Sequence, residues 1–476
     1  MGIGVSGWPL AKAVASYGQL GVVSGSALDT VMSRRLQCGD PDGSIRRALS
    51  FFPWPEMARR ALEANFIPGG KPEGRPFALP PMPGLELDRS TTELLILANF
   101  VEVFLAKEGH NGRVGINYLE KGQLFILPSL LGAMLAGVDV VLMGAGIPVS
   151  IPGILDSLAC WKPVSLKLRV EGASSNLDHR ASLDPKLLAS GPYPELSRPD
   201  FLAVVSTDVL AKSLLRKANG SVEGFVVENH TAGGHNAPPR KKHGSTDSPV
   251  GSYGQKDLPD SGKLRELNRP FWLAGGYGSS SGLQRAQEAG AQGVQVGTIF
   301  AFCAESGILS WIKKEVIGSY LQGTLKVLTD FQASPTGFPF KLISLASAGE
   351  EERIEEPRKR LCDLGHLRTL YCRKPSGVGF RCPSEPVAAF RAKQGKQSDT
   401  EGKRCLCNGL LATIGLGQPG GSGLESPLVT AGEDFSFLGQ ILEQGQLYYT
   451  ARDVLHALLG RSRTKGRLQE APCLCG

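Results

Sequence analysis

The sequence predicts an α/β fold in which parallel strands alternate with helices around a (β/α)8 TIM barrel, with insertions and a helical C-terminal extension. Short apolar runs recur along the first 300 residues, separated by segments with helical spacing. The runs are continuous rather than alternating, which is typical of strands buried on both faces of a parallel sheet. Most of them end in glycine or small polar residues, as the loops of such barrels do. An open doubly wound sheet is the alternative.

Seven core strands are expected from these apolar runs. In chain order they are residues 20–24, 115–118, 138–143, 201–205, 222–227, 271–274 and 293–296. The chain opens on a glycine-rich loop, residues 2–7, and a loop of this kind normally follows a strand. We therefore expect that the first strand of the barrel is truncated. The run 164–170 alternates apolar and polar residues, so we assign it to an insertion, residues 160–199.

Helices are expected between the strands because apolar residues recur there every three to four positions. Their ranges are 8–17, 42–51, 55–64, 91–106, 127–136, a helix starting at 154, 209–218 and 283–289. Ser90 or Thr91 is the expected N-cap of the long apolar helix. The barrel should end near residue 345. An extension, 346–460, follows with helical segments at 405–417 and 437–459, and 461–476 should be a disordered tail.

The composition indicates a globular protein and excludes several classes of partner. The chain has 476 residues, 41% of them hydrophobic and 20% charged, with a net charge of +7. No apolar run reaches the ~18–20 residues of a membrane span, so we expect no membrane partner. The basic residues form no stripe interleaved with aromatics, so no nucleic-acid partner is expected. Ten cysteines in so long a chain do not make a disulfide scaffold, which favours a reducing, cytoplasmic compartment.

Five of the cysteines lie together in the extension, with His366 among them. They are Cys362, Cys372, Cys382, Cys405 and Cys407. Thiolates of this kind can bind zinc or an iron–sulfur cluster. Their spacing is irregular and includes no Cys-x-x-Cys pair, so free buried thiols are favoured and no metal is expected.

The stretch 222–240 carries the main functional signal. An apolar strand leads into the sequence Thr231-Ala232-Gly233-Gly234-His235. Two glycines allow a flat ligand to approach the backbone closely, and a histidine beside it can exchange a proton near neutral pH. The alternative is a tight turn with a surface histidine. The following loop, residues 236–262, is long and polar, and it is either a lid over the site or solvated loop.

Glycine-containing turns also follow the last two expected strands. Gly275-Gly276 ends one of them and Gly297-Thr298 ends the other. In TIM barrels these two positions commonly bind phosphate through backbone amides. Glycine lets the amides face an oxyanion, and the threonine hydroxyl can add a further donor. Ordinary loop glycines are the alternative for each pair taken alone.

The motifs in order resemble those of the nitronate monooxygenases, also called 2-nitropropane dioxygenases, and of the related flavin-dependent enoyl-acyl-carrier-protein reductases. The matching segments are residues 4–7, 21–25, 231–235, 273–276 and 293–298, within a region that spans about residues 1–345. The resemblance implies a TIM barrel that binds FMN non-covalently. The motifs that make this resemblance most specific are Gly-Gly-His and Gln-x-Gly-Thr.

The resemblance also implies roles for individual residues. The FMN phosphate would bind Gly275, Gly276 and the segment containing Gln295, Gly297 and Thr298. The flavin ring would be held by Gly2, Ile3, Gly4, Val5, Ser6, Asn117, Gly233 and Gly234. His235 would be the catalytic proton-transfer residue, with His230 as a second candidate.

The implied reaction is oxidation of an alkyl nitronate with molecular oxygen, giving a carbonyl compound and nitrite. The alternative within the superfamily is NAD(P)H-dependent reduction of an enoyl thioester. A further alternative is a non-catalytic barrel, because Glu228-Asn229-His230-Thr231 departs from the Glu-Gly-x-x pattern expected there.

Overall fold

The centre of the molecule is a parallel sheet whose seven strands follow one another in chain order. A computed structural model describes residues 2–173, 178–188, 191–240, 253–345, 362–373, 376–420, 423–443 and 445–461. The strands are β1 (Gly21–Ser24), β2 (Val114–Leu119), β3 (Val140–Gly144), β7 (Asp200–Val205), β8 (Gly224–Glu228), β9 (Phe271–Ala274) and β10 (Gly293–Gln295). All seven predicted core strands are confirmed.

The order of these strands decides between the two predicted architectures. Neighbours run β1-β2-β3-β7-β8-β9-β10, and every pairing is parallel. A doubly wound sheet reverses its strand order at a switch point, and this sheet does not. The barrel fold is therefore confirmed, as a curved sheet of seven strands. Within the described residues β1 and β10 are its two edges. A strand before Gly2 stays a prediction.

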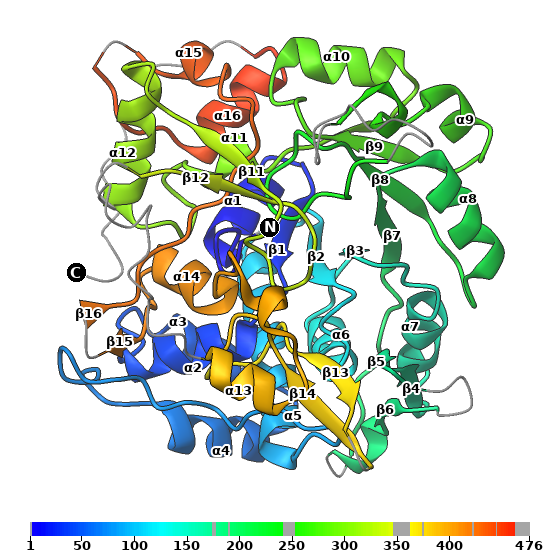
Figure 1. Cartoon of the computed structure of the whole chain (residues 1–476), viewed down its shortest axis with the longest axis vertical. Helices are drawn as coiled ribbons and strands as arrows, with labels where there is room; N and C mark the ends of the chain where they lie inside the picture. The colour runs from blue at the N-terminus through cyan, green and yellow to red at the C-terminus, as the bar shows by residue number, and fades with distance from the viewer. Residues whose placement is uncertain are drawn as a thin grey trace.

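Helices connect these strands and cover the sheet. They are α1 (Trp8–Ser16), α2 (Leu28–Gln37), α3 (Ser44–Ser50), α4 (Pro55–Asn65), α5 (Arg89–Lys107), α6 (Ile126–Leu135), α7 (Ile151–Ala159), α8 (Asp208–Lys217), α9 (Ser261–Arg265), α10 (Ser280–Glu288), α11 (Thr298–Ala301) and α12 (Ser310–Leu321). In Figure 1, α7, α8, α9 and α10 lie along the outer side of the curved sheet. The predicted helices are confirmed to within a few residues.

The cap of α5 was predicted wrongly. Asp88, and not Ser90 or Thr91, is its N-cap, and the Asp88 carboxylate accepts a hydrogen bond from the Thr91 amide at 2.9 Å. The backbone of Asp88 is extended, so its side chain can reach back to the free amides of the first turn. Ser90 and Thr91 already belong to the helix.

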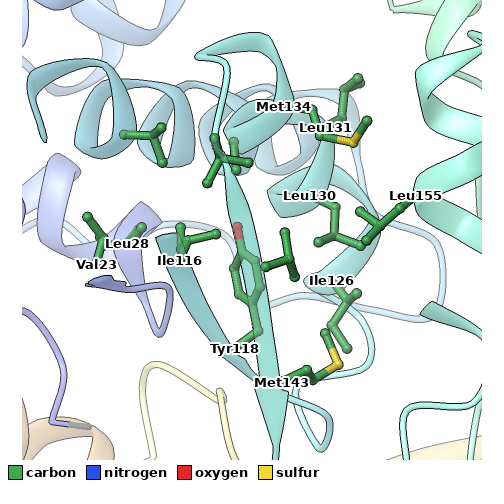
Figure 2. Close-up of a cluster of buried hydrophobic side chains, with 14 of the residues drawn as sticks. Val23, Leu28, Ile116, Tyr118, Ile126, Leu130, Leu131, Met134, Met143 and Leu155 are labelled. Atoms are coloured by element: carbon green, nitrogen blue, oxygen red, sulfur yellow. The ribbon is translucent and has the colours of Figure 1, made fainter. Parts of the chain in front are cut away.

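The main hydrophobic core lies between the sheet and helices α5 and α6. Figure 2 shows Tyr118 of β2 standing among Ile116, Ile126, Leu130 and Met143. The Tyr118 hydroxyl donates to Asn99 Oδ1 at 2.8 Å, so the polar end of this buried ring is satisfied. This packing fixes β2 and therefore the position of Asn117, the preceding residue, on the opposite face of the strand.

The predicted insertion lies outside the main sheet, as expected. Strand β4 (Val164–Lys167) pairs antiparallel with β6 (Arg180–Leu183). A two-residue strand, β5 (Val170–Glu171), pairs with β13 (Thr369–Cys372) of the extension. The insertion and the extension are thus joined through a small sheet of their own.

The extension contains strands as well as the predicted helices. Strand β13 forms a hairpin with β14 (Val378–Arg381), and the helices are α13 (Val387–Ala392), α14 (Leu406–Thr413), α15 (Leu438–Ile441) and α16 (Ala451–Leu458). The extension has a further hairpin, β15 (Pro419–Gly420) with β16 (Gly423–Leu424), and a hairpin of β11 (Val327–Asp330) with β12 (Phe340–Ile343) precedes it. Thr450 caps α16 in a capping box with Asp453.

Some predictions fall outside the described residues. These are residues 241–252 of the lid-like loop, 346–361 at the start of the extension, and 462–476 of the tail. Among the described helices, none combines the length and the apolar character that crossing a membrane requires.

Candidate active site

The glycine turns predicted to bind a cofactor converge on one cavity of about 450 Å³. The turns come from the carboxyl ends of β8, β9 and β10, which are adjacent in the sheet. The lining includes these predicted residues: Gly2, Val5, Ser6, Asn117, Gly233, Gly234, Gly275, Gly276, Gln295, Gly297 and Thr298. We name this space the glycine cavity. Residues nearly 300 positions apart in the sequence therefore share one site.

Two predicted cofactor residues lie elsewhere. Ile3 lines a second cavity, described next, and Gly4 lines neither. Gly4 has φ = +60°, and a β-carbon there would lie 2.6 Å from Ile414 Cδ1. Gly4 therefore serves the turn and its packing against the extension. It is not in place to contact a ligand in either cavity.

The second cavity, of about 410 Å³, adjoins the first and contains His235. Asn117, Glu228, Gly233 and Gly234 line both cavities, so the glycine pair forms their common wall. Most of the other side chains lining the second cavity are apolar, among them Phe125, Ile126, Leu210, Phe340 and Leu410. We name it the histidine cavity. It suits a small or elongated apolar molecule presented to the edge of a ligand in the glycine cavity.

Gly275 and Gly276 have backbone conformations that favour glycine. Their φ angles are +91° and +71°. Asn229 braces this turn, since its Nδ2 donates to the Gly275 carbonyl at 3.0 Å while its Oδ1 accepts from the Thr231 amide at 2.8 Å. A β-carbon on Gly275 would lie 2.3 Å from Asn229 Oδ1. Asn229 thus fixes the turn that faces the cavity.

The donor groups of the glycine cavity fit an anion. Within the described part of the chain, the amides of Gly276 and Gly297 donate to no protein group. A β-carbon on Gly297 would meet no atom within 4 Å, so its surroundings are open. Free amides in an open glycine turn are what a phosphate group requires. The residues present therefore fit the phosphate end of FMN.

A segment of the extension completes the glycine cavity. Thr430 Oγ1 accepts a hydrogen bond from the Gly234 amide at 2.9 Å, and the Gly432 amide donates to Thr298 Oγ1 at 2.7 Å. Thr430, Ala431, Gly432 and Asp434 line the cavity. The fully buried Lys341 of β12 bonds both Glu433 and Thr329 and so anchors this segment. No pattern in the sequence indicates this contact.

His235 is held in a defined position beside the cavity. Its Nε2 lies 2.7 Å from Ser334 Oγ, and its ring packs edge-on against Phe340 with 4.7 Å between centroids. Burial lowers the pKa of His235 to about 3, and the Lys121 ammonium acts in the same direction. The imidazole is therefore neutral at pH 7. It can orient or donate a hydrogen bond to an anionic substrate, but it is a weak proton acceptor.

His230, the second candidate for the proton role, lines neither of the two cavities. Its ring stacks on Tyr253 with 4.4 Å between centroids and 10° between planes. The strand β8 ends at Glu228, and the chain then turns at Asn229, whose Oδ1 accepts from the Thr231 amide.

Two titratable groups missed by the sequence prediction face the same space. Glu228, at the end of β8, lines both cavities, and burial raises its pKa to about 7. His366 lines the histidine cavity, where its Nε2 lies 3.1 Å from Thr30 Oγ1 and its ring packs on Phe125. The position of Glu228 at a strand end could have identified it. His366 gave no such signal, because it comes from the extension.

The raised pKa of Glu228 predicts a pH-dependent effect of removing its charge. A carboxyl whose pKa is higher in the folded protein stabilises the fold at low pH, and this contribution is lost as pH rises through the folded pKa. Between pH 4.5 and pH 8, the free energy of unfolding of wild type should therefore fall by up to about 3 kcal/mol relative to that of Glu228→Gln. Urea unfolding of both proteins at the two pH values measures this. The exposed carboxylate Glu266, changed to Gln, is the control, and equal pH profiles for Glu228→Gln and wild type would contradict the assignment.

No protein-family model and no curated protein matches this chain. Similar solved structures include FabK from Thermotoga maritima, at 15% identity and a TM-score of 0.43 over 96% of this chain and 88% of that one. Nitroalkane oxidase from Streptomyces ansochromogenes has 14% identity and a TM-score of 0.37, over 72% of this chain and 75% of that one. The enoyl reductase domain of MlnA from the macrolactin biosynthesis cluster of Bacillus amyloliquefaciens has 11% identity and a TM-score of 0.42, over 77% and 84%. At these TM-scores the likenesses decide nothing about function.

Proposed function

We propose that this protein is an FMN-dependent oxidoreductase that oxidises alkyl nitronates with molecular oxygen to a carbonyl compound and nitrite. The observation that carries the proposal is the convergence of three glycine turns on one cavity, with a buried imidazole in the adjoining one. The motifs in residues 1–345 that resemble nitronate monooxygenases line these same spaces. A bound flavin would supply the electron-accepting chemistry that this oxidation requires.

Each cavity has its own part in the proposal. The free amides of Gly276 and Gly297, with the Thr298 hydroxyl, would hold the phosphate. Gly233 and Gly234, facing Asn117, would lie against the flavin ring. Bound FMN would supply the electron-accepting chemistry. The substrate would occupy the histidine cavity, where neutral His235 can donate a hydrogen bond to a nitronate oxygen and Glu228 can accept a proton near pH 7.

The apolar lining of the histidine cavity supports one second candidate, reduction of an enoyl thioester with NAD(P)H. An acyl chain could pack against Ile126, Leu210 and Leu410, and a short alkyl group could do so equally well. The two functions differ in what reduces the flavin.

The visible absorption spectrum tests the proposal. The purified protein should be yellow, and acid should release FMN in a ratio of about one per chain. Anaerobic mixing with an alkyl nitronate should bleach the flavin, and admitted oxygen should restore the colour and yield nitrite. Bleaching by NAD(P)H, with no response to nitronate, would instead support the enoyl reductase. Colourless protein that gains no colour with added FMN would support a non-catalytic barrel.

A further inference from the structure

The histidine cavity has a second group of polar side chains that the proposed function does not use. Asp29, in the first turn of α2, lines this cavity, as do Ser26 in the turn before it and His366 from the extension. His235 and Glu228 line the same cavity from the end of β8. A molecule that fills the cavity therefore meets two separate groups of polar side chains.

The two groups come from distant parts of the sheet. Asp29 follows β1 and His235 follows β8, and β2, β3 and β7 lie between these two strands. Neighbouring strands are about 4.8 Å apart, so four steps along the curved sheet amount to at most about 19 Å. Apolar side chains that follow the intervening strands, among them Ile126 and Leu210, line the cavity. A ligand that contacts both groups is therefore elongated and apolar in its middle.

The carboxylate of Asp29 is buried without a hydrogen-bond donor. The residue is 5% exposed. Its Oδ1 is shielded from water and has no partner among the described residues, and no described residue donates to Oδ2 either. Oδ2 is not shielded in the same way, and because Asp29 lines the histidine cavity, this oxygen faces that space. A buried carboxylate without a donor is costly, and a donor on a ligand would offset that cost.

No cation of the described part of the chain neutralises Asp29. The basic group within ion-pair distance is His366, whose Nε2 lies 3.9 Å from Asp29 Oδ1. Burial lowers the pKa of His366, and Arg34 and Arg368 act in the same direction, while the Asp29 and Asp363 carboxylates oppose them. The imidazole is therefore neutral at pH 7. The charge that acts on the buried guanidinium of Arg34 is that of Asp363.

The position of Asp29 at the start of α2 does not account for its burial. A carboxylate in the first turn of a helix interacts favourably with the helix dipole, and it does so equally well at the surface. Asp208 is such a residue in the first turn of α8, where it is partly exposed and lines neither cavity. The burial of Asp29 against a cavity, without a donor, therefore indicates a ligand.

We propose that Asp29 binds a primary ammonium group at the end of the substrate remote from His235. An ammonium group has a full positive charge and three N–H donors. It can donate to Asp29 Oδ2 and to the hydroxyl of Ser26, which has no partner among the described residues. A ligand hydroxyl would supply a donor but no charge.

The substrate class is thus an alkyl nitronate with an amino group at the far end of its chain. The nitronate end of this description rests on the proposed function. The ammonium site rests on the burial and the missing partners of Asp29, and it can be tested without a nitro compound.

The first test measures binding of two probes that share one alkyl chain. Titration calorimetry of the full-length protein with n-hexylammonium chloride should give an affinity at least about 10-fold higher than that for 1-hexanol, because a hydrogen bond between charged groups is stronger than one to a neutral hydroxyl. Neither probe reacts with a flavin. Equal affinities for the two probes in wild type would overturn the proposal without any variant.

Asp29→Asn keeps the shape of the side chain and removes its charge. This variant should bind hexylammonium about 10-fold or more weakly than wild type and bind hexanol nearly as wild type does. The matched control is Asp208→Asn, the same change in the first turn of another helix and outside both cavities. It should keep the wild-type affinity for hexylammonium. Equal affinities in the two variants would contradict a site at Asp29.

The histidine signals in a proton NMR spectrum locate the bound probe. The chain has seven histidines, so the imidazole signals can be assigned with single substitutions. Hexylammonium should shift the signal of His366, which lies beside Asp29, and leave that of His110, which lines neither cavity. A probe that shifts His110 and not His366 binds elsewhere, and the proposal would then be wrong.

Turnover separates this proposal from the proposed function. The nitronate of 6-nitrohexan-1-amine should have a kcat/KM about 10-fold higher than that of 1-nitrohexane, and Asp29→Asn should remove the difference. Equal turnover of the two nitronates by wild type would leave nitronate oxidation standing and overturn the ammonium site. Binding of hexylammonium that requires Asp29, with turnover of neither nitronate, would support the site and overturn nitronate oxidation.

Discussion

Changing Gly276 to aspartate is expected to lower FMN affinity by about 100-fold and to give nearly colourless protein. The Gly276 amide faces the glycine cavity and has no partner among the described residues. A carboxylate at this position would meet the phosphate that the amide is proposed to bind, and like charges in a confined site repel strongly. Aspartate tolerates the φ of +71° better than most residues, so the effect should come from charge rather than from backbone strain. Fluorescence titration of the flavin-free protein with FMN measures it.

Gly323→Asp is the matched control for this substitution. Gly323 has a φ of +69°, and a β-carbon there would meet no atom within 4 Å. It lies after α12, outside both cavities, so the same charge in the same backbone conformation should leave FMN affinity unchanged. Unchanged affinity in Gly276→Asp would show that the phosphate does not bind at β9.

Changing His235 to asparagine should lower turnover by about 100-fold or more while FMN remains bound. His235 lines the histidine cavity, and its Nε2 contacts Ser334 Oγ, a contact that the shorter asparagine side chain would lose. Because burial keeps the imidazole neutral, the rate should not show a step near pH 6.5 that belongs to this residue. Oxygen consumption with an alkyl nitronate, measured from pH 5 to pH 9, gives both the rate and its pH profile.

The control for His235→Asn is the same change at His230. His230 lies on the same loop but stacks on Tyr253 away from both cavities. His230→Asn should therefore keep the wild-type rate. If both variants turn over as wild type does, neither histidine takes part in the reaction. A loss confined to His230→Asn would reverse the assignment.

The strands of the sheet could be predicted because each is a continuous apolar run that ends in glycine. Residues 271–274 illustrate this, since the predicted and observed bounds agree and Gly275 follows directly. Alternation identified residues 164–170 as lying outside the sheet for the same physical reason, because one face of that strand is exposed. The spacing of apolar residues reflects the burial of each position. Strands of a parallel sheet are buried on both faces, so their apolar runs are continuous and easy to recognise.

Contacts between distant segments could not be predicted in this way. The hairpin of β13 and β14 contains arginine, cysteine and glycine, and its strands are stabilised by pairing with β5 some 200 residues earlier. Likewise, nothing near Thr430 or Gly432 indicates that they bond Gly234 and Thr298. For Gly4, the φ of +60° and the contact with Ile414 depend on where the extension packs. A single sequence carries no pattern that reports such partners.

The segment at residues 430–434 also has a consequence for how the protein is made. It closes the glycine cavity against Gly233, yet it leaves the ribosome long after the loop that it contacts. At a synthesis rate of about 5–20 residues per second, roughly 200 intervening residues correspond to about 10–40 s. During that interval the nascent barrel presents an incomplete cofactor pocket. The pocket is therefore completed only after residues 430–434 have been made, and a chain interrupted before residue 430 would carry all the glycine turns without the wall that closes them.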